Sequence, residues 1–98
     1  MKYTQLNDAY KFDVIADAVY ARELEHFHYD FDRRNFEYLI NALPPGEYRL
    51  SIAKRLAETN AQIQNVESIY ASLIAQIDDE EAYAEAVKRS IKKREEKS

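Results

Sequence analysis

The only glycine and the only two prolines of this 98-residue chain are consecutive, at Pro44-Pro45-Gly46. Glycine and proline are the residues that most often interrupt regular structure, so their absence elsewhere leaves long stretches without a strong break. The residue before a proline is pushed out of the α region, whereas proline is tolerated in the first turn of a following helix. The triplet therefore predicts one sharp turn, at residues 44–46, between two long helices.

The segment before the turn has the periodicity of one helix, over about residues 4–43. Residues on one helical face recur at every third or fourth position. The series is Tyr3, Leu6, Tyr10, Val14, Ala18, Ala21, Leu24, His28, Phe31, Asn35, Tyr38 and Ala42. Asp30 or Asp32 could cap a new helix, so two shorter helices are the alternative to one long helix that is straight or kinked near residues 28–32. We expect one long helix that packs through this series.

The segment after the turn, residues 47–77, has a stricter pattern. Spacings of four and three alternate through Ile52, Leu56, Thr59, Ile63, Val66, Tyr70, Leu73 and Ile77, which is the a/d pattern of a heptad repeat. The acidic run at residues 78–81 marks the next boundary, where Asp78 and Glu81 have the spacing of a capping box. A third helix is expected over about residues 80–96, with acidic residues at its start and basic residues at its end.

These segments predict a single all-α domain over residues 1–98. Its expected fold is a long antiparallel helical hairpin, similar to a coiled coil, with a short C-terminal helix. Most of the aromatic residues lie in the first helix, on more than one face, so two helices alone leave apolar surface uncovered. A homodimer that forms a four-helix bundle would cover that surface. We therefore expect a dimeric helical bundle.

Composition excludes several classes of protein. Without cysteine the chain has no disulfide, thiol chemistry or cysteine-bound zinc. It has no run of about 18 apolar residues, so no membrane span is expected. It has no apolar leader segment, which favours the cytoplasm. A glycine-rich phosphate loop is also absent, and the two histidines point in different directions on a helix, so we expect neither an enzyme nor a cofactor.

The leading functional interpretation is a protein–protein interaction module. Tyrosine and arginine are typical anchors of protein interfaces, and the first helix contains an aromatic band that includes arginines. The residues expected at a partner or dimer interface are Phe27, Tyr29, Phe31, Arg34, Phe36, Tyr38, Ile63, Val66, Tyr70 and Leu73. The same residues would otherwise form the core of the bundle. Small adaptors, assembly chaperones and inhibitors, many of them from bacteria or phages, are built in this way.

A nucleic-acid-binding regulator is the first alternative. Residues 52–66 resemble a helix-turn-helix motif, in which Ile63 and Val66 would be apolar anchors, but Ala57 stands where the turn glycine would be. The basic C-terminal segment could contact phosphates through Lys88, Arg89, Lys92, Lys93 and Arg94. The simpler interpretation of that segment is an exposed helix end with charges that match the helix dipole. The chain's net charge of −4 argues against a general nucleic-acid binder.

A metal-binding bundle is the second alternative. Glu-x-x-His occurs twice, as Glu23 with His26 and as Glu25 with His28. This spacing resembles that of the ferritin-like di-iron proteins, which would imply a carboxylate and an imidazole bound to metal. Such sites need further carboxylates from partner helices, and the second helix offers only Glu58 and Glu67, both off its apolar face. A solvated charged face explains the segment without a metal, so no metal ligand is predicted.

Overall fold

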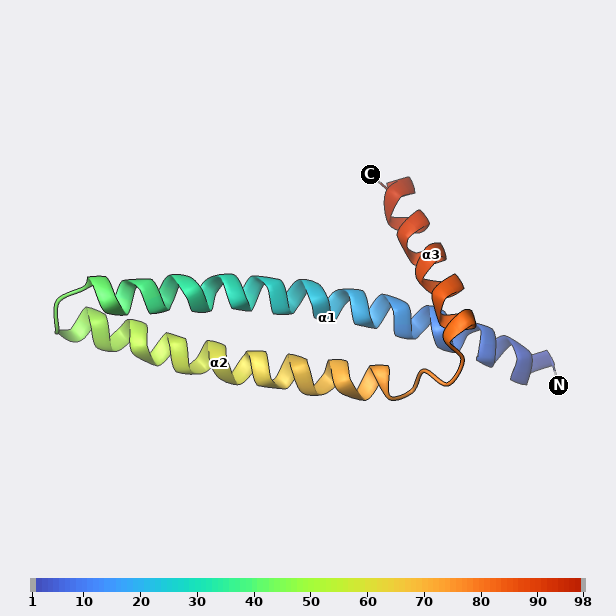
Figure 1. Cartoon of the computed structure of the whole chain (residues 1–98), viewed down its shortest axis with the longest axis horizontal. Coiled ribbons are helices and arrows are strands. Elements are labelled where there is room, and N and C mark those ends of the chain that lie inside the picture. Colours follow the sequence, from blue (N-terminus) through green and yellow to red (C-terminus); the bar gives the residue numbers. More distant parts are fainter. Residues whose placement is uncertain (1, 98) are drawn as a thin grey trace. The chain divides into compact units, whose positions relative to one another are not determined.

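The computed structural model describes the backbone of residues 2–97 and the side chains of residues 10–97. Within these residues the chain consists of helix α1 (Lys2–Ala42), helix α2 (Glu47–Ile74) and helix α3 (Glu80–Lys97), with no strand (Figure 1). The predicted all-α fold is confirmed. None of the described helices combines the length and the apolar character needed to cross a bilayer.

Helix α1 is continuous through residues 28–32, so the alternative of a break there is wrong. The reason lies in Asp30, which was a candidate helix cap. Its carboxylate instead pairs with Arg33, one turn later, and with Arg34, whose Nε lies 3.0 Å from Asp30 Oδ2. Pairs at spacings of three and four stabilise a helix that is already formed. The hydrogen bond from Arg33 also lowers the pKa of Asp30.

The turn lies where the sequence predicts it. Helix α1 ends at Ala42, and α2 begins at Glu47, directly after Gly46. The Gly46 carbonyl accepts the first intrahelical hydrogen bond of α2, from the Leu50 amide at 3.1 Å. Gly46 is therefore the N-cap residue of α2. No described residue has a positive φ angle, so this glycine is not required for a left-handed backbone.

Helix α2 ends at Ile74, three residues before the predicted end at residue 77. Its last turn tightens, because the amides of Gln76 and Ile77 each bond to the carbonyl three residues earlier. The predicted capping box of α3 is also wrong. Asp79, and not Asp78, caps α3, because its Oδ1 accepts the Ala82 amide at 3.1 Å. Asp78 instead pairs with Lys11 of α1 at 3.2 Å.

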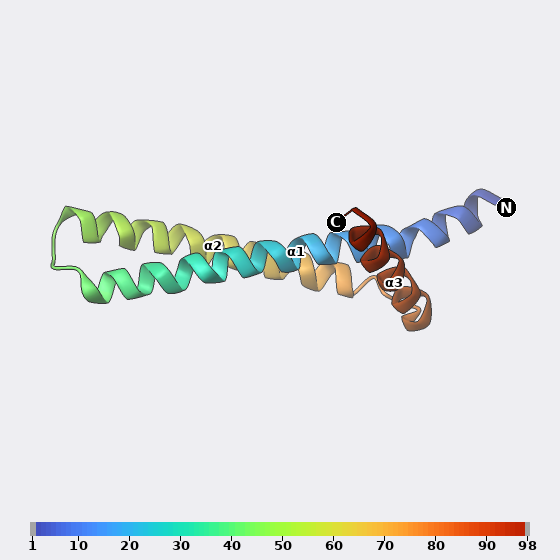
Figure 2. The ribbon, with the colours of Figure 1, turned by 90° about the horizontal axis from the view of Figure 1, so that it is seen from above.

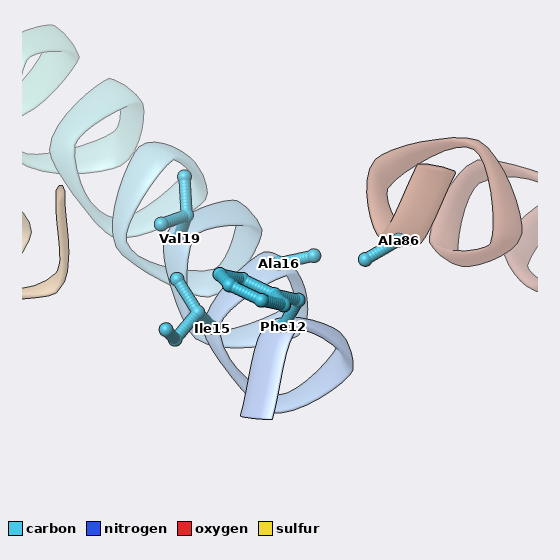
Figure 3. Packing of buried hydrophobic residues seen from close by; sticks show 5 residues of the cluster. All are labelled: Phe12, Ile15, Ala16, Val19 and Ala86. Atoms are coloured by element: carbon cyan, nitrogen blue, oxygen red, sulfur yellow. The ribbon is translucent and has the colours of Figure 1, made fainter. Parts of the chain in front are cut away.

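The chain divides into two compact units. The α3 unit comprises the residues up to Ala21 and those from Tyr70 onward, and the hairpin unit comprises Arg22–Ile69. In the α3 unit, apolar side chains from one face of α1 meet Ala86 of α3 (Figure 3); the α1 residues are Phe12, Ile15, Ala16 and Val19. Half-buried residues pack around this core, namely Leu73, Ile77, Ala82, Tyr83 and Val87. Ala86 is fully buried, and its small side chain allows α3 to approach α1 closely.

In the hairpin unit, α1 and α2 run side by side and antiparallel, as two perpendicular views agree (Figures 1 and 2). Ile52 and Val66 of α2 are 1% and 4% exposed, and Leu56, Thr59 and Ile63 are half-buried between them. Every member of the predicted heptad series that belongs to this unit is thus buried or half-buried. The heptad pattern identified this face because its positions are almost all apolar.

The predicted packed face of α1 is wrong. Tyr3 and Leu6 of the expected series lie outside the residues whose side chains are described. The rest of the series is mostly exposed; it includes Tyr10, Val14, Leu24, Phe31 and Tyr38. In the hairpin unit the half-buried positions of α1 are instead Arg22, Glu25, His26, Tyr29, Asp30, Arg33, Phe36, Leu39 and Ile40. At about 100° per residue, most of these positions lie on the side of the helix opposite the expected series. Because arginine and histidine interrupt the packed face, apolar periodicity did not mark it.

Candidate interaction surface

Helix α1 carries a line of large apolar side chains that nothing in the hairpin unit covers. We call Leu24, Phe27, Phe31 and Tyr38 the outer stripe. These four residues are 43%, 66%, 59% and 70% exposed, in that order. Spacings of three, four and seven place them on one helical face, and α2 packs against the opposite face. Single exposed apolar residues are common, whereas an aligned set is typical of an interaction site.

The remaining residues predicted at an interface divide between the two units. Tyr29 and Phe36 are half-buried on the packed face of α1, where the Arg55 guanidinium of α2 lies 4.8 Å from the centre of the Phe36 ring. Ile63 and Val66 lie in the interior of the hairpin. Leu73 packs against the core of the α3 unit, and Tyr70 of the same unit is exposed.

The large exposed apolar residues of the hairpin unit that sequence reasoning did not name as interface candidates are Leu24, Tyr48, Leu50 and Ile69. Leu24 was expected on the packed face, although its seven-residue spacing from Phe31 and Tyr38 was visible in the sequence. Tyr48 and Leu50, in the first turns of α2, are 63% and 70% exposed. Both lie outside the heptad series, so the sequence offered no periodic signal for them.

The charges around the outer stripe are unevenly compensated. Each arginine of α1 in this unit has an acidic partner on the same helix: Arg22 pairs with Glu25, Arg33 with Asp30 and Glu37, and Arg34 with Asp30. Two exposed carboxylates, Glu23 and Asp32, form no ion pair with any described residue. The net uncompensated charge beside the stripe is therefore negative.

The basic side chains of α3 are largely engaged within the α3 unit. Arg89 Nη2 lies 2.9 Å from Asp13 Oδ1, and Lys93 Nζ lies 3.4 Å from Asp17 Oδ2. Lys88 pairs with Glu85 of its own helix at 3.3 Å. Lys92 forms no ion pair among residues 10–97. Within the basic segment predicted to contact an anion, Arg89 and Lys93 thus pair with aspartates of α1.

A buried serine connects these charges. Ser90 donates a hydrogen bond to Asp17 Oδ1 at 2.7 Å and accepts one from Arg94 at 2.6 Å. The Arg94 guanidinium also lies over the ring of Tyr20, 3.5 Å from its centre. The hydrogen bond from Ser90, together with the positive charges of Lys93 and Arg94, lowers the pKa of Asp17 although partial burial opposes the shift. A hollow of about 380 Å³ lies beside this cluster, between Tyr10 and Val14 of α1 and the side chains of α3.

The structure does not contain the helix-turn-helix that residues 52–66 resemble. The whole segment lies within the uninterrupted helix α2, so no turn separates two helices. Ile63 and Val66, the expected anchors of a recognition helix, pack in the hairpin, while Gln62, Gln64 and Asn65 are exposed. The missing turn glycine, at Ala57, is the local reason that the helix continues.

The two Glu-x-x-His pairs are not assembled into a metal-ligating group. Glu25 pairs with Arg22, and His26 Nε2 lies 3.2 Å from Glu67 Oε2 across the hairpin. His28 is exposed, and its ring meets that of Phe27 edge-on at 5.8 Å. Among the described residues no three acidic, histidine or cysteine side chains gather as a metal site would require.

No protein-family model, curated protein or solved structure matches this chain.

Proposed function

We propose that this chain is a non-enzymatic protein interaction module that binds a protein through the outer stripe of α1. The observation that carries the proposal is the exposure of four large apolar residues on the face of α1 opposite α2. The opposite face of α1 is already occupied, because α2 packs there with Ile52 and Val66 buried.

The chemistry of the stripe suits helix recognition. An amphipathic helix that binds a protein typically uses anchors at spacings of three, four and seven residues, which are the spacings of the stripe. Complete burial of one leucine or phenylalanine side chain contributes about 1.5–3 kcal/mol. Because the four residues are 43–70% exposed, a partner that covers them gains part of this amount at each position.

A homodimer is one form of this proposed function. Two copies that pack through their outer stripes would place four helical segments together as a bundle. The homodimer and the binding of a different protein both depend on the same residues, so one experiment examines both.

Phe31→Ala tests the proposed function. Wild type and variant are used for affinity capture from an extract of the source cells, and both are sedimented across a concentration series. We expect Phe31→Ala to reduce the affinity for the captured partner, or the affinity of self-association, at least tenfold, as is typical for a central aromatic anchor. Circular dichroism should show unchanged helicity because Phe31 is exposed.

Leu50→Ala is the matched control, since Leu50 is equally apolar, is exposed and lies on α2 of the same unit. The control should keep wild-type binding. A wild-type protein that remains monomeric and captures nothing through Phe31 would refute the proposed function.

A further inference from the structure

We propose that the occupant of the outer stripe is a basic amphipathic helix of another protein. Such a helix has apolar residues every three or four positions and lysine or arginine beside them. This inference rests on the proposed function and specifies its partner. It follows from the charges that the hairpin unit leaves uncompensated along α1.

The carboxylates of Glu23 and Asp32, next to the stripe, form no ion pair with any described residue. Arg22, Arg33 and Arg34 already pair with carboxylates of α1, so none of them is available to Glu23 or Asp32. A charge on a surface contributes most when a partner pairs with it, and complementary charges also accelerate association. A basic partner would supply counter-charges next to Glu23 and Asp32.

The two carboxylates lie on opposite sides of the stripe. Successive residues of a helix are about 100° apart. Glu23 directly precedes Leu24, and Asp32 directly follows Phe31, so the two side chains are displaced in opposite directions from the centre of the stripe. A helix that lies along Leu24, Phe27 and Phe31 would therefore place its own flanking positions near one carboxylate on each side.

A second copy of this chain is a poorer occupant. Two outer stripes in contact would bring four uncompensated carboxylates together, two from each copy, and like charges that face each other are destabilising. Arg34, three residues after Phe31 and four before Tyr38, lies on the face of the stripe, and it already pairs with Asp30 at 3.0 Å. A nucleic acid is disfavoured for the same reason, because its phosphates would meet Glu23 and Asp32.

Two designed helical peptides test the inference. Both have leucine at heptad a and d positions; one has lysine at the flanking positions and the other has glutamate. Binding of each fluorescent peptide to the full chain is measured by anisotropy at low and high salt. We expect the lysine peptide to bind at least tenfold more tightly than the glutamate peptide, and salt should reduce that preference.

Charge reversal provides the decisive comparison. Glu23→Lys with Asp32→Lys should reverse the preference in favour of the glutamate peptide. Glu47→Lys with Glu58→Lys, on α2, changes the net charge equally and should leave the preference unchanged. The inference would be overturned if the chain bound both peptides equally or bound neither. It would also be overturned if the double variant on α2 changed the preference as much as the double variant on α1.

The outcomes also separate this inference from the proposed function. If wild type forms a dimer that Phe31→Ala dissociates, the second copy is the occupant; the inference is then wrong and the proposed function stands. If Phe31→Ala changes neither peptide binding nor self-association, the outer stripe is not an interaction surface and both fail.

Discussion

Individual side chains contribute very unequally to this protein, because a thin hairpin has little interior. Among the side chains of residues 10–97, Ile52 is the largest that is fully buried, whereas most of the aromatic residues of α1 are at least partly exposed. Stability of the hairpin unit therefore depends on a few aliphatic positions of α2. The aromatic residues of the outer stripe contribute little to it.

Ile52→Ala should destabilise the hairpin unit by about 2–4 kcal/mol, since it removes buried methyl and methylene groups and leaves a cavity. Unfolding in urea, followed by circular dichroism, measures the change. Leu50→Ala removes a similar side chain two residues away, at an exposed position, and should cost less than about 0.5 kcal/mol. Equal losses for the two variants would contradict the burial of Ile52.

Ser90→Ala should raise the pKa of Asp17 toward its ordinary value of 3.8, because the hydrogen bond from Ser90 is the largest cause of its lowering. A carboxyl group with a lowered pKa in the folded state stabilises that state above its unfolded pKa. This stabilisation is lost as the pH falls from about 3.8 through the lowered value. A ¹³C NMR titration of the Asp17 carboxyl group measures the shift, with the exposed Ser68→Ala as control. An unchanged titration midpoint in Ser90→Ala would contradict the role of the hydrogen bond.

At the scale of the elements, different interactions form the turn and the contact between α3 and α1. The turn uses Pro44-Pro45-Gly46, which ends one helix and begins the next through local backbone preferences. The α3 contact uses a small apolar core together with ion pairs between residues 76 positions apart in the chain. The first is encoded locally, while the second depends on the approach of two distant helices.

Gly46→Asp should stabilise the protein by about 0.5–1 kcal/mol. The new carboxylate can cap α2, and loss of glycine reduces the conformational freedom of the unfolded chain. Gly46 does not have a positive φ angle, and no atom lies within 4 Å of a Cβ placed there, so a side chain fits. The midpoint of urea unfolding reports the gain. Gly46→Ala, which adds no cap, should gain less; a less stable Gly46→Asp would show that Gly46 is not the N-cap.

At the scale of the whole molecule, charge is distributed so that the basic segment is masked. The chain has a net charge of −4, and Arg89 and Lys93 of α3 are neutralised by Asp13 and Asp17 of α1. A phosphate backbone would have to compete with these aspartates. The basic end therefore gives the nucleic-acid interpretation less support than the sequence alone suggested.

Asp13→Asn with Asp17→Asn should increase affinity for a single-stranded DNA oligonucleotide severalfold at low salt, because it leaves Arg89 and Lys93 without partners. Fluorescence anisotropy at several salt concentrations measures the affinity and its salt dependence. Glu95→Gln with Glu96→Gln changes the net charge equally at exposed positions of the same helix and should have a smaller effect. Equal gains in the two double variants would show that Asp13 and Asp17 do not mask the basic residues.

The amino-acid sequence by itself determined the helices, the turn and the packed face of α2. These features are local, since breakers and a heptad of apolar residues act on neighbouring positions. Only the tertiary structure decided which face of α1 packs, because both faces contain aromatic residues and the buried one also contains Arg22, His26 and Arg33. His26 becomes compatible with the hairpin through Glu67, which lies far away in the sequence, whereas Arg22 and Arg33 pair with acidic residues of α1 itself. For the same reason, the exposed stripe and its uncompensated carboxylates emerged only when the helices were placed together.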